Sequence, residues 1–184
     1  MKTLIKNGLI VNEGKSFIGS ILIEDELISD IFSQNDTLPD SDLVIDATSK
    51  VVFPGIIDDQ VHFREPGASH KATIESESKA AILGGVTSFM DMPNNNPPAT
   101  TISDIEKKFD IAQRDSYANY SFYLGATNSN LDEILSVDPT KVCGVKLFMG
   151  SSTGNMLVNN EETLNSIFSK SKIFVMAMYS VSTS

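Results

Sequence analysis

Four polar side chains at alternating positions form the segment best suited to chemistry. They are Asp58, Gln60, His62 and Arg64. Successive side chains of a β-strand point to opposite faces, so residues of the same parity share one face. A carboxylate, an amide, an imidazole and a guanidinium on one face are costly to bury unless they meet a metal ion or a charged ligand. This polar row therefore indicates a metal or ligand site.

The sequence around the polar row predicts where the row lies in the fold. Apolar residues at 51–53 precede it, and the turn-forming residues 65–67 follow it. A solvent-facing strand would carry the same row without any chemical role, but these flanks favour a buried strand over 51–62 that ends at a loop. The carboxyl ends of such strands are where α/β folds commonly build their sites. Gln60 stands where a second imidazole would complete a His-x-His metal clamp.

A lysine in the middle of an apolar strand pattern is the second candidate. Lys146 lies within the run 142–149 and is followed by the glycine- and serine-rich loop 150–154. One interpretation is a lysine at a sheet edge that extends its amine to solvent. The other is a buried lysine whose pKa is lowered, or whose amine is modified into an anion. The loop would let the backbone approach a ligand closely.

The third candidate is Asn94, which follows the apolar run 89–92. It can donate and accept hydrogen bonds at the same rim as Arg64, whose guanidinium is suited to bidentate recognition of a carboxylate. The alternative is that Asn94 only satisfies backbone groups of its own turn.

These candidates are positioned by an α/β pattern that follows a β-rich segment. Residues 1–50 read as short strands, with Asn7-Gly8 as a turn signal. From residue 51, five β units alternate with four helices, which predicts a parallel sheet with right-handed crossovers. Gly84 and Gly85 are expected to end the first helix. Ser103 and Glu106 are expected to form the capping box of the second.

Composition limits the classes of partner. The chain has 184 residues, 41% of them hydrophobic, and a net charge of −10 without a basic cluster, which argues against nucleic acid. No apolar run is long enough to cross a membrane, and the N-terminus lacks the apolar core of a signal peptide. The single cysteine, Cys143, excludes an internal disulfide and favours a cytoplasmic location.

Together these segments resemble the dihydroorotases, within the amidohydrolase superfamily of metal-dependent (β/α) barrels. The resemblance rests on the runs 61–67 and 90–94 and on the strand that carries Lys146, and it extends to about residue 175. It implies an α/β fold with a partial TIM-type barrel of about five β units over 51–184. Residues 1–50 would contribute the N-terminal strands of a small β-sandwich.

The resemblance also implies residue roles. His62 would bind zinc, and Lys146 would be the carboxylated lysine that bridges two zinc ions. Some dihydroorotases use an aspartate instead, but no Asp lies between Lys146 and Asn160. Arg64 and Asn94 would hold the substrate carboxylate. The reaction would be hydrolysis of a cyclic amide, interconverting dihydroorotate and N-carbamoyl-aspartate in pyrimidine biosynthesis, with one or two zinc ions as cofactor.

The sequence departs from the family pattern at two places. Gln60 replaces the first histidine of the metal pair, and an amide oxygen is a weaker zinc ligand than imidazole. At 173–179 the expected metal-binding histidine is missing, and the catalytic aspartate of the last barrel strand does not occur, which leaves the catalytic residue unknown. The expectation is a truncated or frameshifted dihydroorotase that is inactive and poorly soluble or oligomeric.

Two other functions remain open from the sequence. A non-catalytic scaffold that binds a partner enzyme, such as aspartate transcarbamoylase, would explain the lost ligands. A hydantoinase or allantoinase would share the same barrel. The combination of Arg64 and Asn94 favours an acidic substrate, and therefore dihydroorotase.

Overall fold

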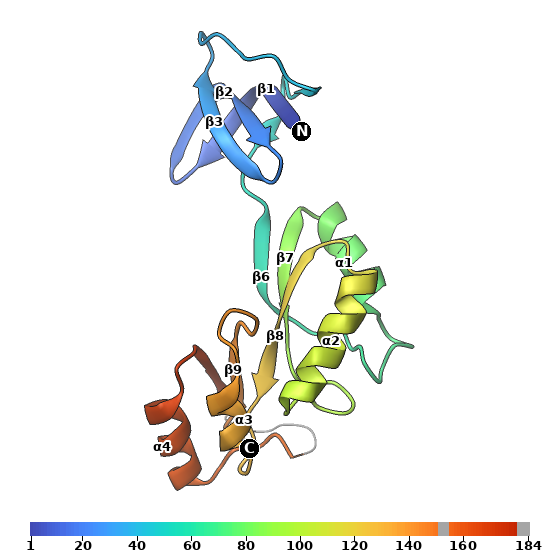
Figure 1. The fold of residues 1–184 in the computed structure, drawn as a ribbon, viewed down its shortest axis with the longest axis vertical. Helices are drawn as coiled ribbons and strands as arrows, with labels where there is room; N and C mark the ends of the chain where they lie inside the picture. Colours follow the sequence, from blue (N-terminus) through green and yellow to red (C-terminus); the bar gives the residue numbers. More distant parts are fainter. Residues whose placement is uncertain (151–154, 180–184) are drawn as a thin grey trace, which may run out of the picture. The chain divides into compact units, whose positions relative to one another are not determined.

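The computed structural model describes residues 1–150 and 155–179 and divides into two compact units, Met1–Pro54 and Gly55–Ser184 (Figure 1). Each unit is built around one five-stranded sheet. The first unit is all-β within its described residues, and the second alternates strands with helices.

The first unit contains the strands β1 (Lys2–Asn12), β2 (Lys15–Glu24), β3 (Leu27–Ser33), β4 (Leu43–Asp46) and β5 (Val51–Val52). Strands β1, β2 and β3 pair antiparallel, and both β4 and β5 pair parallel to β1. The turn expected at Asn7-Gly8 is instead a register shift inside β1, between Ile5 and Gly8. Asn7 takes a positive φ of 62°, which a short polar side chain tolerates, so the strand continues through this point.

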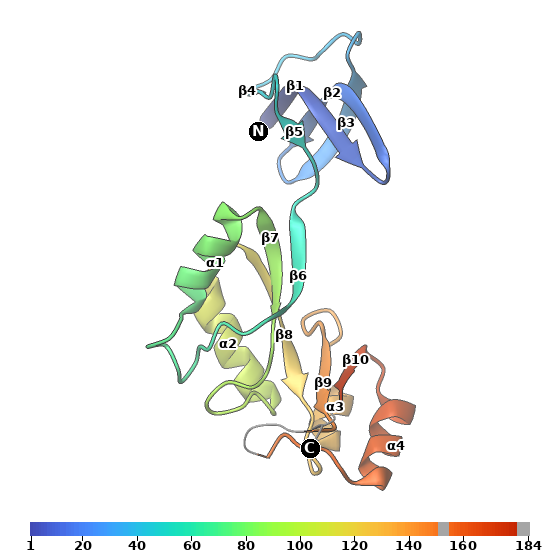
Figure 2. The ribbon, with the colours of Figure 1, turned by 180° about the vertical axis from the view of Figure 1, so that it is seen from behind.

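The second unit places its strands in the order β10-β9-β8-β7-β6, all parallel. The strands are β6 (Ile56–Val61), β7 (Val86–Asp91), β8 (Asn119–Gly125), β9 (Gly144–Phe148) and β10 (Val175–Met178). The helices are α1 (Ile74–Leu83), α2 (Ile102–Asp115), α3 (Leu131–Ser136) and α4 (Glu161–Lys170). This curled, open half-barrel confirms the predicted partial (β/α) barrel (Figures 1 and 2).

The core of the second unit lies between the sheet and its helices. Phe89 on β7, Phe122 on β8 and Val145 on β9 are almost fully buried, and Ile105 and Ala112 on α2 pack against this layer. The ring of Phe63 joins it, with its centroid 4.4 Å from that of Phe89. The apolar face of α2 therefore lies against the sheet.

The strand expected over 51–62 is two strands in two different sheets. Val51 and Val52 pair with β1 of the first unit, whereas β6 begins at Ile56 and pairs with β7. The expectation that this segment is buried is also wrong, since Ile57 is 62% exposed. The physical reason is that β6 is an edge strand of the described sheet, so burial begins only where Phe63 enters the core.

Helix ends follow capping chemistry. The predicted capping box at Ser103 and Glu106 is wrong, because Thr101 is the N-cap of α2 and its hydroxyl accepts the Asp104 amide at 3.1 Å. The helix begins at Ile102, so the N-cap is Thr101, two positions before the predicted Ser103. The predicted end of α1 is confirmed, with Gly84 as C-cap and Gly85 at a φ of +87°. Among the described helices, none is both long and apolar enough to cross a membrane.

Candidate functional site

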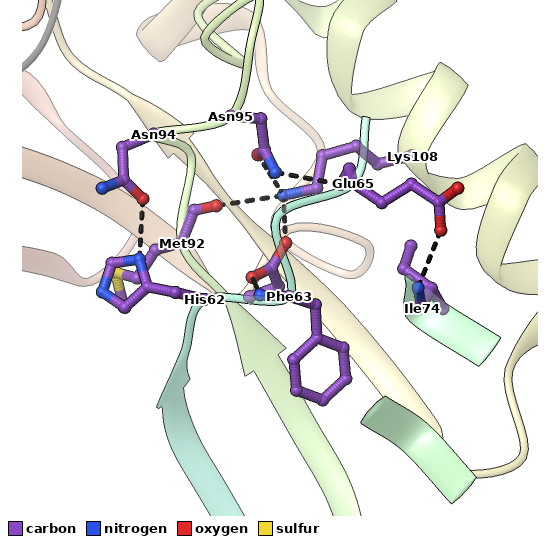
Figure 3. Close-up of polar contacts among 9 residues, drawn as sticks. His62, Phe63, Glu65, Ile74, Met92, Asn94, Asn95 and Lys108 are labelled. Carbon is purple, nitrogen blue, oxygen red and sulfur yellow. Dashed lines mark hydrogen bonds and ion pairs between the residues drawn. The ribbon is translucent and has the colours of Figure 1, made fainter. Parts of the chain in front are cut away.

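The loops after β6 and β7 bring two predicted site residues into direct contact. Nδ1 of His62 lies 2.7 Å from Oδ1 of Asn94 (Figure 3). Because a carbonyl oxygen only accepts, Nδ1 of His62 donates in this contact, which leaves Nε2 as the ring nitrogen that can face a ligand. A histidine oriented in this way presents one nitrogen to a ligand and holds its ring in place with the other.

Arg64 lies in the loop after β6, in a backbone conformation that is unusual for its residue type. Its φ is +67°, in the left-handed region that non-glycine residues seldom adopt. Its side chain lines a cavity of about 260 Å³ together with Asn94. The other lining residues are Ala68, Lys71, Asn95, Asn96 and Pro98. Since the cavity has two cationic groups and no acidic one in its lining, it favours an anionic ligand.

The two loops are held together by hydrogen bonds to backbone carbonyl groups. Nδ2 of Asn95 donates to the carbonyl of Glu65 at 2.9 Å, and the Asn96 amide donates to the carbonyl of Pro66 at 3.3 Å. The carboxylate of Glu65 in turn accepts the amide of Ile74, the first residue of α1, at 2.7 Å. A carboxylate at a helix N-terminus satisfies a free N–H group and interacts favourably with the helix dipole.

A fully buried ion pair lies beneath the loops. Nζ of Lys108, on α2, is 2.7 Å from Oδ2 of Asp91, at the end of β7, and both side chains are 0% exposed. The ammonium also donates to Oδ1 of Asn95 at 2.8 Å and to the carbonyl of Met92 at 3.1 Å (Figure 3). Burial lowers the pKa of Lys108, and the Asp91 carboxylate opposes that shift. The ammonium thus lies among three oxygen atoms, which belong to Asp91, Met92 and Asn95.

Lys146 is buried in the middle of β9, at 2% exposure. The interpretation of this lysine as one that reaches solvent at a sheet edge is therefore wrong, because β8 and β10 flank β9 on both sides. Its Nζ lies 5.3 Å from the ring centroid of Phe148. No carboxylate in the described ranges forms an ion pair with it, and burial lowers its pKa.

Replacing Lys146 by Met is expected to raise the free energy of unfolding at pH 7 by about 1–3 kcal/mol, because a buried polar group is exchanged for an apolar one. The folded-state pKa of Lys146 lies below the unfolded value of 10.5, so the unfolded chain binds more protons and stability rises as pH approaches 10.5. Urea unfolding at several pH values measures both effects. The gap between the variant and the parent should narrow with rising pH, and a constant gap would contradict this account.

The structure does not assemble a complete metal site. His62 follows β6 and Lys146 lies on β9, so two further strands, β7 and β8, separate them in the sheet. Gln60 is exposed on β6. Within the described residues there is no group of three or more His, Cys, Asp or Glu side chains that could hold a metal ion. Two protein ligands are fewer than zinc sites use, so the residues present do not fit the zinc centre that the resemblance implies.

Sequence reasoning missed four residues that position the loops. They are Glu65, Asp91, Asn95 and Lys108. The signal for the ion pair is present in the sequence, because Lys108 lies on the apolar face of α2, three positions after Ile105 and four before Ala112. Asp91, the last residue of β7, likewise interrupts the apolar run 89–92. Opposite charges at two core positions of neighbouring elements predict a buried pair.

Comparisons with known proteins show which family this chain is similar to. A family model described as "Dihydro-orotase-like" matches residues 49–136. A dihydroorotase of Thermococcus kodakarensis is 34% identical over 89% of this chain and 38% of its own length, and one of Enterococcus faecalis is 38% identical over 74% and 32%. The chain belongs to the dihydroorotase-like amidohydrolases.

Hydrolases of other cyclic amides are also similar to this dihydroorotase-like chain. An Escherichia coli allantoinase is 33% identical over 86% of the chain and 34% of its own length. The structure of an Arthrobacter aurescens L-hydantoinase superposes with a TM-score of 0.82 and 27% identity, over 90% of this chain and 37% of that one. The chain thus spans between about a third and two fifths of the length of these relatives.

Proposed function

We propose that this dihydroorotase-like chain supplies the substrate-carboxylate side of a site that interconverts dihydroorotate and N-carbamoyl-aspartate. The observation that carries the proposal is the shared cavity of Arg64 and Asn94, with Asn94 bonded to His62. A guanidinium and an amide on one wall match a carboxylate, which accepts hydrogen bonds from both. The protein to which the site belongs would act in pyrimidine biosynthesis.

The charge of the cavity favours this substrate over the alternatives. Arg64 and Lys71 are its cationic residues, and a carboxylate-bearing ring gains from both. Hydantoin and allantoin carry no carboxylate. A hydantoinase- or allantoinase-type reaction remains the second candidate, because an L-hydantoinase and an allantoinase are among the similar proteins.

Binding of N-carbamoyl-L-aspartate is expected to depend on Arg64. Arg64→Ala should weaken the binding at least about tenfold, since a hydrogen bond between charged groups contributes about 1.5–3 kcal/mol. Chemical-shift titration of the ¹⁵N-labelled chain measures this affinity even when it is weak. Arg114→Ala is the matched control, because the described hydrogen bonds and ion pair of Arg114 are with Asp115, at the protein surface. Tighter binding of hydantoin or allantoin than of N-carbamoyl-L-aspartate would favour the second candidate.

The family resemblance also suggests zinc, with His62 and Lys146 as ligands and Gln60 as a weak third. Because the described residues supply too few ligands, we expect no turnover of dihydroorotate by this chain alone, with or without added zinc. A spectrophotometric assay with highly purified protein checks this. Turnover that persists through purification and is abolished by His62→Ala would contradict it.

The remaining assignments are part of the same proposal. Residues 1–50 would form part of a small β-sandwich and 51–184 part of the barrel. A cytoplasmic location is supported by the single cysteine, Cys143, which fits a reducing compartment. A scaffold role toward a partner enzyme would be consistent with the incomplete ligand set, and co-purification with aspartate transcarbamoylase would test it.

A further inference from the structure

We propose that the buried Asp91–Lys108 pair positions Arg64 and Asn94 for ligand binding, an inference that rests on the function proposed above. The pair itself touches neither of the two side chains in a described hydrogen bond. It acts through the residues on either side of them. Asp91 and Lys108 are therefore positioning residues.

The Asp91 carboxylate connects the loop after β6 to helix α2. Its Oδ1 accepts the backbone N–H of Phe63 at 2.9 Å, and its Oδ2 pairs with Lys108 at 2.7 Å. Phe63 lies between His62 and Arg64 in the chain. One carboxylate thus fixes the backbone directly before Arg64.

The Lys108 ammonium fixes the other parts of both loops. It donates to the carbonyl of Met92 and to Oδ1 of Asn95, which lie on either side of Asn94. The same Asn95 side chain donates to the carbonyl of Glu65, directly after Arg64. The network therefore holds both chain neighbours of Arg64, and it holds Met92 and Asn95 before and after Asn94 (Figure 3).

The backbone of Arg64 shows why such a network is needed. A non-glycine residue at a φ of +67° is disfavoured and persists only where its surroundings over-determine it. The contacts of Phe63 and Glu65 provide that constraint. Without them, Arg64 would relax toward ordinary φ values and its guanidinium would leave the cavity wall.

Burial distinguishes this pair from an ordinary stabilising contact. A buried ion pair is weak evidence for stability, because an apolar pair of similar volume often serves as well or better. Here both charges are fully buried, and the described hydrogen bonds of the pair all join it to residues 63, 92 and 95 of the two loop regions. Nζ of Lys108 also lies 4.7 Å from the ring centroid of Phe122. A positioning role explains why Asp91 and Lys108 occupy core positions at which apolar side chains would also pack.

The test uses a double variant of the full chain, Asp91→Asn with Lys108→Met. It leaves no unpaired buried charge, and the side-chain amide introduced at position 91 keeps an oxygen that can accept the Phe63 amide. Lys107→Met is the matched control, because Lys107 is the neighbouring lysine on α2 and is 65% exposed. Two quantities are measured: affinity for N-carbamoyl-L-aspartate by chemical-shift titration, and amide hydrogen exchange.

A positioning role predicts a local effect. The amides of Ala68 and Asn96, whose acceptors are the carbonyls of Arg64 and Pro66, should exchange at least about tenfold faster in the double variant. The amides of Val145 and Gly125, bonded to Phe174 and Ala99, should keep their protection. Affinity should fall at least about tenfold, and Lys107→Met should change neither quantity.

Each other outcome is decisive. If Arg64→Ala weakens binding but the double variant does not, the positioning inference is overturned and the proposed function stands. If the parent chain does not bind the ligand, the proposed function fails, and unchanged exchange at Ala68 and Asn96 then overturns the inference as well. Loss of protection throughout the sheet also overturns it, since the pair would then serve folding as a whole.

Discussion

Replacing Lys108 alone by Met is expected to lower the free energy of unfolding by about 3–5 kcal/mol, because it leaves the Asp91 carboxylate buried without its cation. Asp91 is 0% exposed and keeps only the Phe63 amide as a donor among its described contacts. Methionine retains the length of the lysine stem, so lost packing contributes little. Urea unfolding followed by circular dichroism measures the change.

Lys107→Met separates this effect from a change of helix propensity or net charge. Lys107 and Lys108 are adjacent on α2, and the substitution removes the same group at both positions. Lys107 pairs with Asp104 at the surface, where such pairs contribute about 0–1 kcal/mol. Equal losses in the two variants would show that burial of the Asp91–Lys108 pair does not determine the cost.

The parts of the fold that were predictable are those with a repeating local pattern. The alternation of strands and helices from residue 51, the apolar face of α2 and the end of α1 at Gly84 all follow from periodicity and glycine placement. The assignment of 51–62 to one buried strand failed because pairing partners are non-local. Local sequence does not reveal that Val52 joins the first sheet, or that β6 has a single strand neighbour in the described structure.

The site was predictable to a similar extent. Strand parity and loop position indicated that His62, Arg64 and Asn94 would lie at one rim, and the structure places His62 against Asn94 and Arg64 beside the same cavity. The burial of Lys146 decided between two open interpretations. What holds the loops was not found, because the Asp91–Lys108 contact joins two elements that are separated in the sequence and meet through tertiary packing alone.

Gly67→Ala is expected to lower the free energy of unfolding by about 1–3 kcal/mol more than Gly85→Ala does, the range for overpacking. Both glycines have a positive φ, +95° and +87°, so both substitutions introduce the backbone strain of a side chain in this region. The two glycines differ in the space available for a Cβ atom. A Cβ at Gly67 would collide with the carbonyl oxygen of Asn96, whereas nothing lies within 4 Å of one at Gly85.

The same substitution should impair the cavity, which gives it a second readout. The obstructing atom at Gly67 is backbone, so relief requires the loop at Asn96 to move away from Pro66, whose carbonyl it contacts at 3.3 Å. Both loops line or adjoin the cavity that holds Arg64 and Asn94. Affinity for N-carbamoyl-L-aspartate should therefore fall in Gly67→Ala and stay at the parent value in Gly85→Ala. Equal affinities in the two variants, with unequal stabilities, would mean that the loops can separate without moving the residues that bind the carboxylate.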